Sequence, residues 1–109
     1  MIEIRRPSIV DGHAISALLN SLGYPDTESF IERRINQLVA HQDADILVAT
    51  VDGTVVGFVS LHFIPQLALD RDFCRITYFC VSEAHRNLGI GSLLESKVVS
   101  LAKSVAVPV

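Results

Sequence analysis

The residue types best suited to binding a ligand lie in one segment, Val81 to Ser92, between a predicted strand and a predicted helix. Gly89 and Gly91 stand at the start of that helix, where glycine lets backbone N–H groups approach an anion without obstruction by a Cβ atom. The helix dipole adds about half a positive charge at the same point. Arg86 precedes Gly89 by three residues, and its planar set of donors suits a second phosphate oxygen. The segment therefore predicts a phosphate or pyrophosphate site.

The glycine pair alone leaves other interpretations open, of which the simplest is a tight turn between strand and helix. A Walker loop requires a Lys-Ser or Lys-Thr pair after its second glycine, whereas Gly91 is followed by Ser92 and Leu93. A dinucleotide-binding fingerprint requires a small residue where Leu94 stands and an acid about 20 residues later, for which the chain is too short. Both motifs are excluded. A different nucleotide-phosphate site is the weaker alternative, because no Mg²⁺ motif accompanies the loop.

Composition narrows the class of protein. The chain has 109 residues, of which 50% are hydrophobic and 19% charged, and its net charge is −3. These values indicate a single folded domain over residues 1–109, and two cysteines are too few for a disulfide scaffold. No apolar run approaches the roughly 20 residues that cross a bilayer, and residues 1–6 lack a signal-peptide layout. We expect a cytoplasmic protein that contacts neither membranes nor nucleic acid, since an acidic chain lacks the basic patch of a phosphate-backbone binder.

Hydrophobic periodicity predicts the elements that position the glycine segment. The apolar stripe of the first helix begins after Asp11, a capping residue, and Gly23 follows its last turn. Asp26 or Thr27 can cap the second helix, which should end near His41. Strands are predicted over residues 1–6, 46–51, 55–64 and 73–81, and helices over 12–22, 28–41 and 90–101.

The order of these elements predicts the fold class. Asp52-Gly53 stands between two β-branched runs and is a strong hairpin signal, because both residues tolerate positive φ. The order β-α-α-β-β-β-α then gives an α/β fold of the α+β kind, with a mixed sheet that combines an antiparallel meander and a crossover. The strands over 46–51 and 55–64 are apolar on both faces, so we expect helices on both faces of the central sheet.

A family resemblance starts from the glycine segment. The run Arg86-Asn87-Leu88-Gly89-Ile90-Gly91 resembles the Arg/Gln-x-x-Gly-x-Gly/Ala motif of the GNAT family of N-acetyltransferases. The element order is similar too, and the resemblance runs from residue 2 to about residue 104. Further similar segments are 4–11, 22–25 and 55–58.

The resemblance implies an activity and a set of binding residues. Family members transfer an acetyl group from acetyl-CoA to a primary amine of a small molecule or peptide, by direct attack of the neutral amine. Their loop N–H groups cradle the coenzyme A pyrophosphate, and the end of the preceding strand pairs with the pantetheine arm and polarises the thioester carbonyl. The acetyl-CoA contacts implied here are Phe79, Cys80, Val81, Arg86, Asn87, Leu88, Gly89, Ile90, Gly91 and Ser92.

The chain departs from the family pattern in two ways. Family members often carry a carboxylate on the strand over 73–81, whereas Arg75-Ile76-Thr77 stands at that place. The usual C-terminal strand-helix-strand part, whose helix often bears a proton-donating tyrosine, is lacking. We therefore expect an incomplete fold or an obligatory partner, which also accounts for the high apolar content. A non-catalytic or truncated acetyl-CoA-binding, dimerising module is the alternative function.

The general base and acid are not identified by any motif. His62 and Tyr78 are the candidates to exchange protons, although a histidine or tyrosine in an apolar strand is more often a packed residue. Tyr24 is a candidate substrate contact, because the resembling family uses the corresponding loop as a lid; a simple turn is the alternative. His85 and Glu83 flank the glycine segment as solvated residues.

The remaining reactive side chains are interpreted structurally. Cys74 and Cys80 are six residues apart in one strand, about 20 Å along it, so they cannot form a disulfide and are expected to be core thiols. The four histidines share no ligand spacing with cysteines or acids, so no metal site is expected.

An open sheet edge is expected to bring copies of the chain together. The strand over 73–81, or a short strand made of Val105 to Val107, would present unpaired backbone groups and an apolar face. We expect a homo-oligomer formed through this edge.

Overall fold

The structure is a computed structural model that describes residues 1–104. Its elements follow the predicted order, and the strand from Phe73 and the helix from Ile90 begin where the sequence predicts. Among the described residues, no helix is both long and apolar enough to cross a bilayer. The elements are β1 (Ile2–Arg5), the 3₁₀ helix η1 (Ile9–Asp11), α1 (Gly12–Ser21), α2 (Ile31–Ala40), β2 (Ala44–Val51), β3 (Thr54–Ile64), β4 (Phe73–Val81), the 3₁₀ helix η2 (Glu83–His85) and α3 (Ile90–Ser104).

The four strands form one sheet in the order β1-β2-β3-β4, and each neighbouring pair is antiparallel. The Asp52-Gly53 hairpin is confirmed: these residues have φ of 49° and 85°, the positive values that a two-residue turn needs. The parallel pairing that a mixed sheet requires does not occur among residues 1–104. Two helices, rather than a short turn, connect the antiparallel neighbours β1 and β2.

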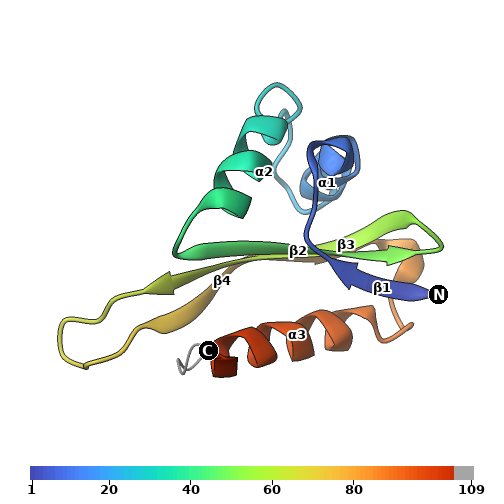
Figure 1. Cartoon of the computed structure of the whole chain (residues 1–109). Coiled ribbons are helices and arrows are strands. Elements are labelled where there is room, and N and C mark those ends of the chain that lie inside the picture. Colours follow the sequence, from blue (N-terminus) through green and yellow to red (C-terminus); the bar gives the residue numbers. More distant parts are fainter. Residues whose placement is uncertain (105–109) are drawn as a thin grey trace.

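Helices cover both faces of the sheet, as predicted. Figure 1 shows α1 and α2 together above the sheet and α3 below it. On the α1–α2 side, Ile15 and Ile35 pack with Phe58 of β3. On the α3 side, Leu94 and Val98 pack with residues of the same strand and its neighbours. The sheet is thus the middle layer of three, which explains why its central strands are apolar on both faces.

A β-bulge interrupts β4 at Thr77. Ser60 pairs with Tyr78 and Leu61 pairs with Ile76, so Thr77 has no partner residue on β3. One unpaired residue reverses which side chains face which layer. Cys74 accordingly packs in the α3 core and Cys80 in the α1–α2 core, and both are buried free thiols, as the sequence predicts.

The expected capping hydrogen bonds do not form at either helix of the upper layer. Asp11 does occupy the position before α1, but its carboxylate makes no capping hydrogen bond there. It instead accepts bonds from Arg5 Nη1 at 2.8 Å and Nη2 at 2.9 Å, and from the Ser8 backbone N–H at 2.8 Å. A charged, two-pronged partner outcompetes a neutral helix N–H for the same oxygens.

The second helix begins later than the capping candidates Asp26 and Thr27 predict. α2 begins at Ile31, and neither Asp26 nor Thr27 caps it. The Thr27 hydroxyl is buried and donates to Ser16 Oγ at 2.7 Å, which ties the connecting segment to α1. The backbone N–H of Ile31 reaches the Thr27 carbonyl oxygen at 2.9 Å, so a turn precedes the regular helix.

Replacing Asp11 with asparagine is expected to destabilise the fold in a pH-dependent way. The Arg5 guanidinium beside Asp11 lowers the pKa of this buried carboxyl. Its stabilising contribution is therefore complete above the unfolded pKa of about 3.9 and is lost as the pH falls through the lower folded pKa. Asp11→Asn should lower the unfolding free energy at pH 7 by about 1.5–3 kcal/mol. Urea titrations should also show that the unfolding free energy of the variant depends less on pH below about pH 4.

The matched control is Asp52→Asn. Asp52 pairs with the amino terminus at 2.7 Å, but both groups are exposed and solvent screens their attraction. Its removal should leave stability nearly unchanged. Equal losses in the two variants would contradict a specific role for the Arg5–Asp11 pair.

Candidate functional site

The loop between β4 and α3 has the backbone geometry of an anion site. Asn87 and Gly89 both have positive φ, of 73° and 79°, and α3 begins directly afterwards at Ile90. The N–H groups of the first turn have no partners within a helix, and the first helical bond runs from Leu93 N–H to the Gly89 carbonyl oxygen at 3.1 Å. A hollow of about 280 Å³ lies here, lined by Val81, His85, Arg86, Asn87, Gly89, Ile90, Gly91 and Ser92.

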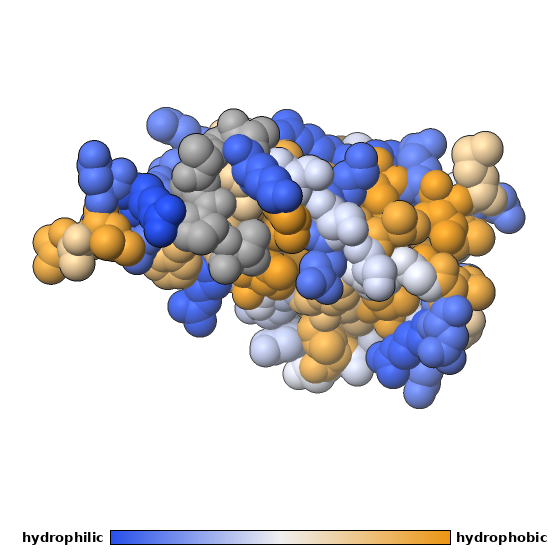
Figure 2. All heavy atoms as spheres, turned by 90° about the horizontal axis from the view of Figure 1, so that it is seen from below, coloured by the Kyte–Doolittle hydropathy of each residue, from blue (hydrophilic) through white to orange (hydrophobic). Residues whose placement is uncertain are grey.

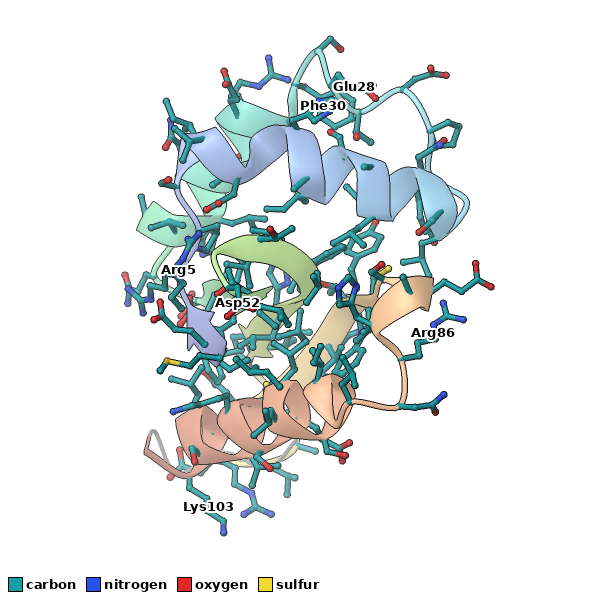
Figure 3. The ribbon with its side chains drawn as sticks, turned by 90° about the vertical axis from the view of Figure 1, so that its right-hand side faces the viewer. Arg5, Glu28, Phe30, Asp52, Arg86 and Lys103 are labelled. Carbon is teal, nitrogen blue, oxygen red and sulfur yellow. The ribbon has the colours of Figure 1, made fainter. Side chains whose placement is uncertain are left out.

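Two further observations describe the surroundings of this hollow. His85 Nδ1 is buried and has no hydrogen-bond partner. Gly91 faces the Phe79 ring, which a Cβ atom would approach to 3.8 Å, so the first turn lies against the end of β4. Figure 3 shows the exposed Arg86 side chain extending outward from the same loop. Of the predicted acetyl-CoA residues on this loop, Leu88 alone does not line the hollow and is exposed.

Among residues 1–104, the end of β4 presents backbone groups at an edge that pairs with no other strand. Ser82 N–H donates to the Val56 carbonyl oxygen at 2.7 Å. Antiparallel alternation then turns the backbone groups of Cys80 toward β3 and those of Phe79 and Val81 away from it. The position of the Cys80 carbonyl oxygen supports this orientation, because it lies 3.0 Å from the place that a Cβ atom at Gly57 on β3 would occupy. Phe79 and Val81 therefore offer N–H and C=O groups to an extended ligand, whereas Cys80 offers neither.

A cleft with two compartments opens on the α1–α2 side of the bulge. The outer compartment, about 630 Å³, lies beside the far ends of β3 and β4. The inner compartment, about 470 Å³, extends beneath α2. Their shared wall is formed by His41, His62, Thr77 and Tyr78.

The three sequence-predicted residues for catalysis and substrate binding meet at this cleft. Tyr24 stacks edge-on against Tyr78, with ring centroids 5.3 Å apart and planes at 84°. His62, from β3, is half-buried, and its Nδ1 atom has no hydrogen-bond partner. Tyr24, His62 and Tyr78 all line the outer compartment. Residues from the α1–α2 connection, β3 and β4 are thus brought to one place.

The sequence matches the model of one protein family. A family model described as "Acetyltransferase (GNAT) family" matches residues 13–107. The chain belongs to the GNAT family. The matched residues include both the α3 loop and the cleft at the β4 bulge.

Solved structures share this GNAT fold at low sequence identity. A ribosomal-protein-alanine N-acetyltransferase from Brucella melitensis biovar Abortus 2308 matches with a TM-score of 0.77 and 24% identity, over 98% of this chain and 75% of that one. A GNAT family acetyltransferase from Staphylococcus aureus matches with a TM-score of 0.85 and 20% identity, over 97% and 81%. Glucosamine-6-phosphate N-acetyltransferase from Arabidopsis thaliana matches at 0.86 and 18%, over 100% and 80%.

Sequence reasoning missed two polar residues of this GNAT cleft. His41 was expected only at a helix end, yet its ring centroid lies 6.4 Å from that of His62. Its Nδ1 accepts the Asp43 backbone N–H at 2.9 Å, which leaves Nε2 as the N–H donor. Asp43 also lines the outer compartment, so the acidic residue that borders the cleft comes from the segment between α2 and β2 rather than from β4. The available signal was the His-x-Asp run at the predicted end of the second helix.

The described residues contain no group of three or more His, Cys, Asp or Glu side chains placed to hold a metal ion. The Cys74 thiol is buried, and burial raises its pKa, so it is a poor nucleophile at neutral pH. Candidate chemistry among residues 1–104 is therefore concentrated at the α3 loop and the cleft.

Proposed function

We propose that this protein is an acetyl-CoA-dependent N-acetyltransferase that acts on a primary amine of a small molecule or peptide. The observation that carries the proposal is the placement of β4 between the two sites. The anion hollow begins at Val81 and the cleft lies at Thr77, four residues or about 14 Å away along one strand. Between them lies the open backbone edge of Phe79. A long ligand anchored by phosphate at α3 can thus lie along β4 and present its reactive end at the bulge.

The proposed binding residues form two groups, one for the pyrophosphate and one for the pantetheine arm. The first-turn N–H groups of α3 and the Arg86 guanidinium would hold the pyrophosphate, as the hollow they line fits an anion. The open-edge groups of Phe79 and Val81 would pair with the pantetheine amides. The Phe79 N–H is then the donor nearest the bulge that can hydrogen-bond the thioester carbonyl oxygen and stabilise negative charge there.

Two side chains of the shared wall are proposed to exchange protons. When bound, acetyl-CoA supplies an activated acetyl group: a C–N bond to the amine forms and the C–S bond breaks. An ammonium substrate loses two protons on becoming an amide; one is returned to the departing sulfur and one goes to solvent. We assign His62 as the acceptor, because its imidazole is half-buried in the wall, and Tyr78 as the donor to sulfur.

Calorimetry and a thiol-release assay test the proposed function. Titration of the full chain with coenzyme A and with acetyl-CoA should give saturable heat, and a panel of amines should give amine-dependent release of free thiol. Absence of heat with both ligands at millimolar concentration would rule the proposal out. Binding without thiol release from any amine would instead favour the non-catalytic acetyl-CoA-binding module.

The homo-oligomer stays a prediction. Among residues 1–104, β4 pairs with β3 alone, which leaves its other edge open. Beside this edge lies a hollow of about 450 Å³, lined by Ile76, Phe79, Val98 and Val99 together with the charged residue Glu95. Figure 2 shows hydrophobic patches on the α3 face, interspersed with hydrophilic residues. The strand expected at 105–107 lies outside the described residues.

A further inference from the structure

We propose that the acceptor is a primary monoamine with an apolar body, and that this body occupies the inner compartment beneath α2. The inference rests on the proposed function and names the substrate class of the same site. Its basis is the lining of the inner compartment, whose back and sides come from the apolar faces of both upper helices and the sheet. These apolar residues are Leu19, Phe30, Ile31, Leu38, Ile46 and Phe58.

The reactive nitrogen and the apolar body are placed by different parts of the cleft. His62, Thr77 and Tyr78 form the wall between the compartments, so an amine at this wall lies next to the β4 bulge. From there a substrate can extend into either compartment. The outer one is lined by apolar residues of β3 and β4 but also by the charged residues Asp43 and Arg75. The inner one lies beneath α2, contains no acidic residue and removes more hydrocarbon from water. An apolar body is therefore stabilised more in the inner compartment than in the outer one.

The charges of the inner compartment disfavour a second amino group. No aspartate or glutamate is among the residues that line it, and Arg34 is its one permanently charged residue. Arg34 donates to Gln37 Oε1 at 2.7 Å and forms no ion pair within the described part of the chain. A diamine would bury its second cation without a counter-ion and near a positive charge, which is unfavourable. An aminosugar carries more hydroxyl groups than the apolar residues allow, although Gln37 and Ser60 also line the compartment, and hydroxyl groups left against hydrocarbon are unfavourable.

The direct test is a homologous series of amines. With acetyl-CoA saturating, KM should fall about fourfold for each methylene added from propylamine to hexylamine, because each one buries further hydrocarbon. The kcat value should stay nearly constant, since the reacting end is unchanged. 1,4-Diaminobutane, ethanolamine and glucosamine should each have a KM at least tenfold above that of butylamine. A KM independent of chain length, or lowest for the diamine, would overturn the proposal.

Two variants locate the effect in the inner compartment. Leu38→Asp places a carboxylate in its half-buried lining and should raise the hexylamine KM at least tenfold while lowering that of 1,4-diaminobutane. Phe30 is 36% exposed, so Phe30→Ala carries little risk to folding. It removes an aromatic ring from the lining and should raise the KM for hexylamine. Figure 3 shows Phe30 in the turn that leads into α2. Leu67→Asp, at the fully exposed tip of the β3–β4 connection, is the matched control and should change nothing.

A binding measurement separates failure of this inference from failure of the proposed function. Hexylamine is titrated calorimetrically into the full chain, with and without coenzyme A. If coenzyme A does not bind but hexylamine binds and Leu38→Asp abolishes that binding, the proposed function fails and the inner compartment remains an amine site. If coenzyme A binds and hexylamine does not, the proposed function stands and the inferred substrate class is wrong.

Discussion

A chain with glutamine in place of His62 is expected to transfer acetyl groups about 100- to 10,000-fold more slowly, with unchanged affinity for coenzyme A. Glutamine keeps the polarity and approximate size of the side chain in the shared wall of the cleft, but it cannot accept a proton. The α3 loop lies at the other end of β4 and contains none of the residues involved. A steady-state assay of kcat, together with calorimetry of coenzyme A binding, measures both quantities.

Two comparisons distinguish proton transfer from a structural role of His62. His13→Gln alters an exposed histidine on α1 and should leave kcat unchanged. His62→Ala should regain part of its activity when imidazole is added to the assay, because the small base can enter the space left beside Tyr78. A His62→Gln rate within tenfold of the unaltered chain would assign the proton to water or to another group.

Glutamate in place of Gly91 is expected to weaken coenzyme A binding at least 100-fold, or roughly 3 kcal/mol. The new carboxylate would stand in the first turn of α3, within the lining of the anion hollow, and would repel the pyrophosphate. The same position favours the helix itself, because a negative charge near the N-terminus interacts well with the helix dipole. The variant should therefore remain folded while it loses its ligand, which calorimetry and circular dichroism can check together.

Ser100→Glu is the control for a change of net charge. Ser100 is exposed on α3, and Lys97 and Lys103 lie on its neighbouring turns, so one more negative charge is tolerated there. Coenzyme A affinity should be unaltered. Equal weakening by the two substitutions would mean that overall charge, and not the α3 loop, controls binding.

The errors at the helix starts have one physical origin. Asp11 and Thr27 are good capping residues, and capping residues were therefore predicted from the local sequence. In the fold, Arg5 reaches Asp11 across the β1–α1 connection, and Ser16 on α1 accepts the Thr27 hydroxyl. Tertiary partners of this kind cannot be read from capping preferences, since they depend on how α1 and its neighbours pack.

The bulge in β4 is visible in the sequence as a change in the spacing of apolar residues, but a two-residue strand period does not predict it. Cys74 and Ile76 keep the two-residue spacing, and Phe79 resumes it after a step of three. The register with β3 explains that step, because Thr77 is the residue without a partner. The consequence is functional: the step places Tyr78 on the same layer as His62, at the wall of the cleft.

The sequence by itself determined the chain segment with which this protein is proposed to bind a phosphate group. Positive φ at Gly89, a helix start at Ile90 and a nearby arginine are local properties, so their residue types and spacing suffice to predict them. Only the tertiary structure decided which residues surround the substrate cleft. Tyr24, His41, His62 and Tyr78 are far apart in the chain, and the pairing of β3 with β4 and the packing of α2 on the sheet bring them together.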